Sequence, residues 1–172
     1  MRPLFVTDPP PPVEDWLAHR RALGQDRFDE VWEGDYHVAP APSGRHAELQ
    51  VQVAIVLRET ASSVGLVVRG PSNIGDPSDY RVPDLVLSRD PADQVWYPTA
   101  AIVVEVVSPG DESRQKLGFY HRVGVEEVVI VDPERRTVEW FARSDDAFVA
   151  TGASAVVGLN RGELVEAIDW PA

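Results

Sequence analysis

Apolar positions along the chain recur with two periods, and the two periods predict different elements. A helical period with matching start and stop signals predicts helices over residues 13–23, 44–62 and 112–123, and a closing helical turn over 163–168. Alternating or continuous apolar runs between turn residues predict strands over 28–32, 36–39, 66–69, 80–88, 101–107, 126–131, 137–142, 148–151 and 156–157. Residues 71–78, rich in Gly, Pro, Asn and Asp, predict a loop.

The helix expected over 44–62 has an unusually wide apolar surface. One stripe holds Leu49, Val53, Val56 and Leu57, and a second holds Ala47, Val51, Ala54 and Ile55. Residues at these spacings lie on neighbouring faces of one helix, so the pattern predicts a broad buried face.

The order of the elements predicts a mixed α/β fold with a central sheet. The strand over 101–107, AIVVEVV, is apolar on both faces and should therefore be central. Ser108–Asp111 stops this strand and caps the helix that follows it. That helix leads to the strand over 126–131, and such a crossover makes the two strands parallel. We expect a Pro-rich arm over 1–12 and a single domain over 13–172.

Composition and charge exclude several classes of protein. The chain has no cysteine, which excludes disulfide frameworks and thiolate metal sites and fits a reducing, cytoplasmic environment. No apolar run approaches the roughly 18 residues of a membrane helix. The net charge of −12 argues against a generic nucleic-acid coat, but it leaves open a nuclease with a local basic cleft or with a bound metal.

Two acidic residues interrupt apolar strands. Glu105 lies in the middle of AIVVEVV, where an ionised carboxylate costs several kcal/mol unless it is paired or bound to a cation. Asp84 follows Pro83 in YRVPDLVL, at an edge or a bulge. Glu105 paired to a buried arginine and Asp84 shaping a turn are the structural alternatives. If the two strands pair antiparallel, both carboxylates reach one end of the sheet and offer Mg²⁺ two hard oxygen ligands.

The only lysine of the chain is a further candidate. Fifteen of the sixteen basic residues are arginine, and the exception is Lys116. Either this is chance, or the position needs a compact ammonium whose pKa can fall. Lys116 shares a helical stripe with Tyr120, so it can reach the end of the preceding strand, orient or deprotonate a water and stabilise charge on a phosphate.

These residues resemble a known family. VPDLVL followed by VVEVVSPGDESRQKLGFYHRVGVEEVVIVDPERRTVEWF is similar to the Uma-two-type restriction-endonuclease-like proteins, long known as a domain of unknown function within the PD-(D/E)XK nuclease superfamily. The segment FDEVWEGDYHVAPAPSGRHAELQ is similar to the N-terminal part of that family, so the resemblance covers roughly residues 13–143. It implies an α/β fold with a restriction-endonuclease-like αβββαβ core, in which helices flank a mixed central sheet.

The resemblance also implies roles for individual residues. Asp84 and Glu105 match the two metal-binding acids, and the backbone carbonyl of Val106 is an extra ligand. The superfamily lysine usually stands two residues after the second acid, where this chain has Val107, so Lys116 matches a lysine that has moved to the helix. Glu33 and His46 lie where such nucleases place accessory catalytic groups.

The implied reaction is Mg²⁺-dependent hydrolysis of DNA phosphodiester bonds, with one metal ion or two and with Mn²⁺ as a substitute. Lys116 would assist the attacking water. Cutting two strands takes two sites, so we expect a homodimer with DNA as its substrate and no membrane partner. Two alternatives stay open. One is an inactive nuclease-fold protein acting as a binding or interaction module, and the other is a nucleotide hydrolase that uses the same acidic pair.

Overall fold

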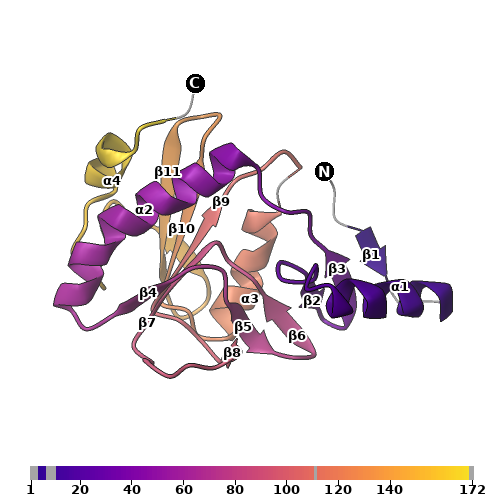
Figure 1. Cartoon of the computed structure of the whole chain (residues 1–172). Coiled ribbons are helices and arrows are strands. Elements are labelled where there is room, and N and C mark those ends of the chain that lie inside the picture. The colour runs from indigo at the N-terminus through magenta and orange to yellow at the C-terminus, as the bar shows by residue number, and fades with distance from the viewer. Residues whose placement is uncertain (1–3, 7–10, 111, 171–172) are drawn as a thin grey trace.

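The computed structural model describes residues 4–6, 11–110 and 112–170 (Figure 1). The helices in these ranges are α1 (Pro11–Ala22), α2 (Gly44–Ser63), the short 3₁₀ helix η1 (Ser113–Lys116), α3 (Leu117–Arg122) and α4 (Arg161–Ala167). None of these helices has the length and apolar character needed to cross a membrane. Within the predicted Pro-rich arm, α1 already begins at Pro11, whereas Pro9 and Pro10 lie outside the described residues.

One sheet of six strands, counted in the described residues, forms the centre of the fold, and we call it the core sheet. Its strands, in spatial order, are β12 (Phe148–Ala150), β11 (Thr137–Arg143), β10 (Glu127–Asp132), β9 (Ile102–Val106), β7 (Leu85–Ser88) and β4 (Val67–Arg69). β9 and β10 are parallel, as the crossover predicted, and β7 pairs antiparallel with β9. In chain order, α2, β4, β7, β9, α3 and β10 form the expected αβββαβ core.

A second sheet packs beside the first, and we call it the outer sheet. Its six strands among the described residues are β1 (Leu4–Val6), β3 (Asp35–Val38), β2 (Glu30–Trp32), β6 (Asp79–Arg81), β5 (Asn73–Asp76) and β8 (Trp96–Tyr97). β5 and β8 are parallel, while the other neighbours are antiparallel, so this sheet is mixed as well. The strands predicted over 28–32 and 36–39 are β2 and β3 of this sheet.

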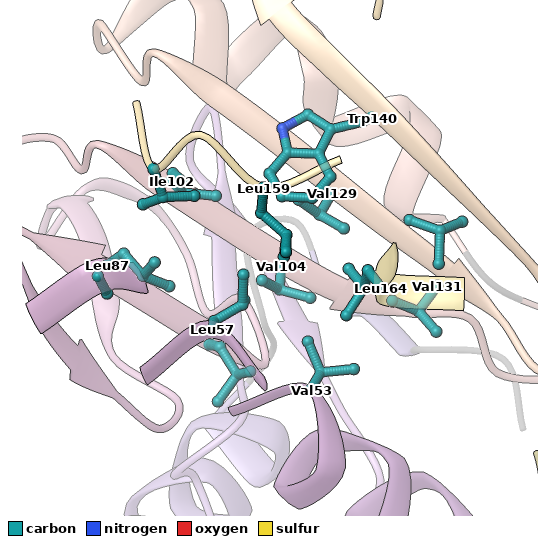
Figure 2. Packing of buried hydrophobic residues seen from close by; sticks show 14 of the residues in the cluster. Val53, Leu57, Leu87, Ile102, Val104, Val129, Val131, Trp140, Leu159 and Leu164 are labelled. Carbon is teal, nitrogen blue, oxygen red and sulfur yellow. The ribbon is translucent and has the colours of Figure 1, made fainter. Parts of the chain in front are cut away.

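The two faces of the core sheet bury different partners because side chains alternate along each strand. One face packs against α2 and α4, as Figure 2 shows for Val53 and Leu57 of α2 and Leu164 of α4. The opposite face packs against Phe119 and Tyr120 of α3. The labelled residues on the first face also include Leu87, Ile102, Val104, Val129, Val131, Trp140 and Leu159.

The strand predicted over 80–88 is in fact two strands in two different sheets. β6 ends at Arg81 in the outer sheet, and β7 begins at Leu85 in the core sheet. The crossing occurs at Val82–Asp84, where Pro83 cannot donate a hydrogen bond to a continuing ladder. The crossing sets Asp84 between the two sheets.

The loop predicted over 71–78 contains a strand, β5, that pairs with β6 and β8. The loop was predicted because the segment is rich in residues that favour turns, Gly75 among them. In the structure Gly75 lies inside a strand, where close packing requires glycine. Its φ is 118°, and a Cβ there would collide with the backbone oxygen of Asp79 and the ring of Phe119. Glycine therefore permits a close approach between neighbouring backbones.

Three further predictions need correction. The helix expected over 112–123 begins as the 3₁₀ turn η1 before α3, and the expected capping residue Asp111 lies outside the described residues. The second stripe of α2 is not buried throughout, because Val51 and Ile55 are exposed. Residues 156–157 form a turn and not a strand.

Candidate functional site

A cavity of about 360 Å³ opens where the outer sheet meets the core sheet, and we call it the Asp84–Glu105 cavity. Five residues predicted from the sequence line it: His46, Asp84, Glu105, Val106 and Lys116. They come from the start of α2, from the crossing between the sheets, from β9 and from η1. The fold thus brings these five residues to a single site.

Asp84 is held by contacts from three directions. The backbone N–H of Val106 donates to Oδ2 at 2.7 Å, and Oδ1 lies 2.6 Å from Nε2 of His46. The side-chain amide of Gln50 donates to the backbone oxygen of Asp84 at 2.7 Å. The first two contacts fix the Asp84 carboxylate beside Val106 at the end of β9, and the third holds the Asp84 backbone.

The backbone oxygen of Val106 points to the same side of β9 as Asp84. Val106 donates its N–H to Asp84, and the N–H and C=O of a strand residue point to the same side. The register that pairs Leu85 with Val104 sets Pro83 opposite Val106. Because proline has no N–H, it cannot occupy the Val106 carbonyl with a ladder hydrogen bond.

Glu105 points to the face of the core sheet that carries α3. Tyr120 donates its hydroxyl to Glu105 Oε1 at 2.5 Å, and Lys116 Nζ lies 3.1 Å from Oε1 and 3.3 Å from Oε2. Burial raises the pKa of the Glu105 carboxyl to about 8; Lys116 opposes this shift, and the negative charge of Asp84 adds to it. Without a bound metal ion, the charged form of the Glu105 carboxyl is therefore less stable than it would be in water.

Lys116 lies between two carboxylates. Its Nζ donates to Glu30 Oε1 at 2.8 Å and reaches Glu105 on the other side, while only 12% of its side chain is exposed. Burial alone would lower the pKa of Lys116, but the charges of Glu105 and Glu30 outweigh it and raise that pKa. The expectation of an ammonium with a falling pKa is therefore wrong, and Lys116 is a stable cation.

Glu30 is a member of this cluster that the sequence analysis missed. Besides Lys116, it accepts hydrogen bonds from the N–H of Val82 at 2.7 Å and from Trp32 Nε1 at 2.6 Å. Burial raises the pKa of Glu30, but Lys116 and these donors outweigh it, and the net shift is downward. A signal was available, since Phe28, Glu30 and Trp32 alternate along the strand predicted over 28–32. All three line the cavity, although β2 itself begins only at Glu30.

Glu33, which the resemblance favoured, lies elsewhere. It occupies the turn between β2 and β3 with φ 53°, and its side chain is 78% exposed. Its nearest charged partner is Arg122, at 3.8 Å, and Glu33 does not line the Asp84–Glu105 cavity. The structure brings Glu30 to the cluster and not Glu33.

His46 reaches Asp84 because it lies in the first turn of α2, three residues after the N-cap Ser43. Ser43 caps the helix by accepting a hydrogen bond from the N–H of His46 at 3.3 Å. The ring spans two side chains, with Nδ1 lying 3.0 Å from the Ser108 hydroxyl and Nε2 facing Asp84. This arrangement holds the imidazole and carboxylate in a fixed relative position.

The donor set fits a hard divalent cation with open coordination positions. Asp84, Glu105 and the Val106 carbonyl have oxygen atoms that could hold such an ion, since Mg²⁺ in proteins uses one or two carboxylates and keeps several waters. Among the described residues there is no group of three or more His, Asp or Glu side chains that could enclose a metal, so a closed all-protein cage is not formed there. A bound cation would favour the charged form of the Glu105 carboxyl, whose pKa burial otherwise raises.

Comparisons with known proteins identify a family and a fold. The family model described as "Putative restriction endonuclease" (Uma2) matches residues 15–166. No curated protein matches the chain. Among solved structures, the chain is similar to a crystal structure described as "a putative nuclease belonging to DUF820" from Anabaena variabilis ATCC 29413, with 15% identity over 81% of this chain and 90% of that chain and a TM-score of 0.67.

At 15% identity this likeness shows a shared fold, and it confirms the predicted α/β class. The family match covers most of the chain and supports a nuclease function. The chain belongs to the Uma2 family, whose description is "Putative restriction endonuclease".

Proposed function

We propose that this protein is an Mg²⁺-dependent DNA endonuclease that hydrolyses phosphodiester bonds. The observation that carries the proposal is the convergence of Asp84, Glu105 and Lys116 in one cavity from separate parts of the fold. Asp84, Glu105 and the Val106 carbonyl would hold Mg²⁺, or Mn²⁺ in its place. A bound divalent ion supplies Lewis-acid polarisation of the phosphate and makes a bound water more acidic.

The side chains around the metal ligands would perform distinct tasks. Lys116, held as an ammonium, donates hydrogen bonds to the attacking water and to the phosphate oxygen that gains negative charge. Glu30 fixes the position of that ammonium. His46 is a positioning residue for Asp84, which it contacts directly. The acids act as metal ligands and not as nucleophiles.

The test is metal binding paired with DNA cutting. Mg²⁺ and Mn²⁺ are titrated by calorimetry into wild type and Asp84→Asn, and both proteins are assayed on supercoiled plasmid and single-stranded DNA. We expect binding and nicking to disappear together in the variant. Unchanged cutting by Asp84→Asn would refute the assignment.

A matched pair of variants separates Glu30 from Glu33. Both are glutamates of one hairpin, but only Glu30 contacts Lys116. We expect Glu30→Gln to reduce cutting and Glu33→Gln to leave it unchanged. The reverse result would return Glu33 to the site.

Two other outcomes identify the alternatives. Metal binding without nicking by wild type would favour a catalytically inactive nuclease-fold protein that serves as a binding module. Release of phosphate from nucleotides without DNA nicking would favour a nucleotide hydrolase.

We also propose that the enzyme acts as a homodimer, because cleavage of both strands requires two sites. Light scattering coupled to gel filtration measures its mass in solution. A monomer that cuts both strands would contradict this part of the proposal.

A further inference from the structure

A second cavity, of about 590 Å³, lies beside the Asp84–Glu105 cavity and shares part of its wall. We call it the arginine groove, after Arg45, Arg114, Arg135 and Arg136, which line it. The shared residues are Ser43, His46, Ser108, Pro109 and Gly110. A chain-like ligand bound in one cavity can therefore continue into the other.

The electrostatic character changes along this continuous surface. The described residues that line the Asp84–Glu105 cavity include one lysine and four carboxylates, those of Glu30, Asp84, Glu105 and Glu112. The described lining of the arginine groove has four arginines and two carboxylates, those of Asp132 and Glu134. The first cavity thus suits a cation. In the second, Arg114 is paired with Glu139 and Arg135 lies beside Asp132. The preference of the second cavity for an anion therefore rests mainly on Arg45 and Arg136.

One of the two carboxylates in the groove is engaged by its own turn. Asp132 is buried and accepts a hydrogen bond from the backbone N–H of Arg135 at 3.0 Å, with Arg135 Nε at 3.8 Å. Its negative charge is therefore largely compensated by Arg135 within the same turn. Arg45 and Arg136 are exposed along the groove.

The four arginines come from three segments that are distant in the sequence. Arg45 is the second residue of α2, Arg114 belongs to η1, and Arg135 and Arg136 lie in the turn between β10 and β11. No basic run marks them in the sequence, and the fold alone assembles them. The planar guanidinium donates hydrogen bonds in a fork that matches a phosphate group.

Arg136 occupies its position at an energetic cost. Its φ is 53°, in the left-handed region, where a non-glycine residue is less stable by about 1 kcal/mol. Glycine would adopt this conformation without strain. Replacing Arg136 by glycine therefore removes the guanidinium without adding backbone strain.

We propose that the arginine groove binds the phosphodiester backbone of the DNA strand that enters the Asp84–Glu105 cavity. This inference rests on the proposed nuclease function and refines it. The preferred substrate is a polynucleotide with phosphates on at least one side of the bond that is cut, and not an isolated phosphodiester.

The first experiment measures binding without cutting. Fluorescence anisotropy follows labelled single-stranded and duplex oligonucleotides binding to wild type, Arg45→Gln and Arg136→Gly in EDTA over a range of salt concentrations. We expect several-fold weaker binding in each variant, and a slope of log affinity against log salt that falls by about 1 per arginine. Arg58→Gln is the matched control, because Arg58 is an exposed arginine of the same helix as Arg45 that does not line the groove.

Arg136→Gly should change stability and DNA binding in opposite directions. Relief of the left-handed strain should raise the unfolding temperature, while loss of the guanidinium weakens binding. A variant that merely disturbs folding would lower both. Arg136→Lys keeps the charge, and its salt slope should stay close to that of wild type.

The second experiment compares DNA with a small substrate, bis(p-nitrophenyl) phosphate. We expect the ratio of kcat/KM for DNA to kcat/KM for the small diester to fall in Arg45→Gln and Arg136→Gly. Arginine-dependent binding in a protein that cuts neither substrate would uphold the groove and refute the nuclease proposal. DNA cutting by wild type with unchanged binding and ratios in both variants would refute the groove alone. Absence of oligonucleotide binding by wild type would also overturn it.

Discussion

Two buried glutamates of neighbouring parallel strands are stabilised in opposite ways. Glu127, at the start of β10, accepts four hydrogen bonds from neutral donors: Trp140 Nε1 at 2.9 Å, the Ser154 hydroxyl at 2.6 Å, and the N–H groups of Ala155 at 2.8 Å and Val156 at 3.2 Å. Glu105, in β9, has the Tyr120 hydroxyl and the Lys116 ammonium, and it lines a cavity.

The two carboxylates also lie on opposite faces of the core sheet. Alternation places Glu127 on the same face as Val129 and Val131, which pack under α2 and α4. Glu105 shares the face of Val103, which packs toward α3. Glu127 ties the segment after β12 to the sheet, whereas Glu105 faces an open site.

Burial of a carboxylate is therefore a poor indicator of function by itself. Both glutamates are almost fully buried. The distinguishing feature is the donor set, because neutral donors that fill all acceptor positions leave nothing for a ligand. Glu105 shares its lysine with Glu30 and has a second acid, Asp84, beside it. The cluster therefore keeps negative charge that a metal ion can neutralise.

The largest expected difference between the two glutamates is in catalysis. Glu105→Gln removes a proposed metal ligand and should lower the rate of Mg²⁺-dependent plasmid nicking by roughly 10³-fold, since metal stabilisation of the transition state amounts to several kcal/mol. Glu127→Gln should stay within a few-fold of wild type, because its contacts are structural. Nicking rates of the two folded variants at saturating Mg²⁺ provide the test, and equal losses in both would remove the distinction.

The second difference is in the pH dependence of stability without metal. The folded pKa of Glu105 is about 8, against 4.5 for the unfolded chain. Its contribution to stability is therefore complete below pH 4.5 and is lost as the pH rises through 8, since the folded state retains a proton that the unfolded state has released. Glu105→Gln should remove this decline and exceed wild type in stability by up to a few kcal/mol at pH 9.

Urea unfolding in EDTA at pH 5, 7 and 9 measures this effect. Wild type and Glu105→Gln should be most alike at pH 5 and diverge as the pH rises. A constant difference across the three pH values would show that the carboxyl of Glu105 does not titrate in this range.

Sequence reasoning located Glu105 for a local reason. AIVVEVV contains one acid in an otherwise apolar run, and the crossover to the next apolar strand fixes that run at the centre of the sheet. Asp84 was found in the same way, although its strand proved to be two. The break at Pro83 is part of the site, because it sets Asp84 between the two sheets.

Residues whose roles depend on distant contacts escaped prediction. Glu30 meets Lys116 across 86 positions of sequence, and no local pattern encodes that contact. Two acids begin the segment EEVVIVD, and polar residues are common at the start of a strand. The local pattern therefore did not predict that Glu127 is buried. Its partners, Ser154–Val156, come from the weakly patterned segment after β12.

The third difference is in folding stability at neutral pH. Glu127→Gln replaces an acceptor oxygen with an amide group that turns donors toward Trp140, Ser154 or the backbone N–H groups. Buried donors without acceptors should lower the free energy of unfolding by about 2 kcal/mol. Glu127→Gln should thus be less stable than wild type in thermal and urea unfolding, while Glu105→Gln in EDTA is not. A Glu127→Gln protein as stable as wild type would show that water can replace these contacts.

The smallest difference comes from removing one hydroxyl donor at each glutamate. Tyr120→Phe deletes the 2.5 Å hydrogen bond to Glu105, and Ser154→Ala deletes the 2.6 Å bond to Glu127. Each variant should lose about 1 kcal/mol of stability, and Ser154→Ala somewhat more, because Ser154 also accepts the N–H of Val157 at 2.9 Å. Their functional effects should separate them.

Only Tyr120→Phe alters the orientation of a proposed metal ligand. We expect its nicking rate to fall by less than about tenfold, the equivalent of one net hydrogen bond, together with weaker Mg²⁺ binding by calorimetry. Ser154→Ala should keep the Mg²⁺ affinity of wild type, since its hydroxyl acts at the other end and on the other face of the core sheet. If Tyr120→Phe lost stability but kept its Mg²⁺ affinity, Tyr120 would serve Glu105 only as Ser154 serves Glu127, by satisfying a buried carboxylate.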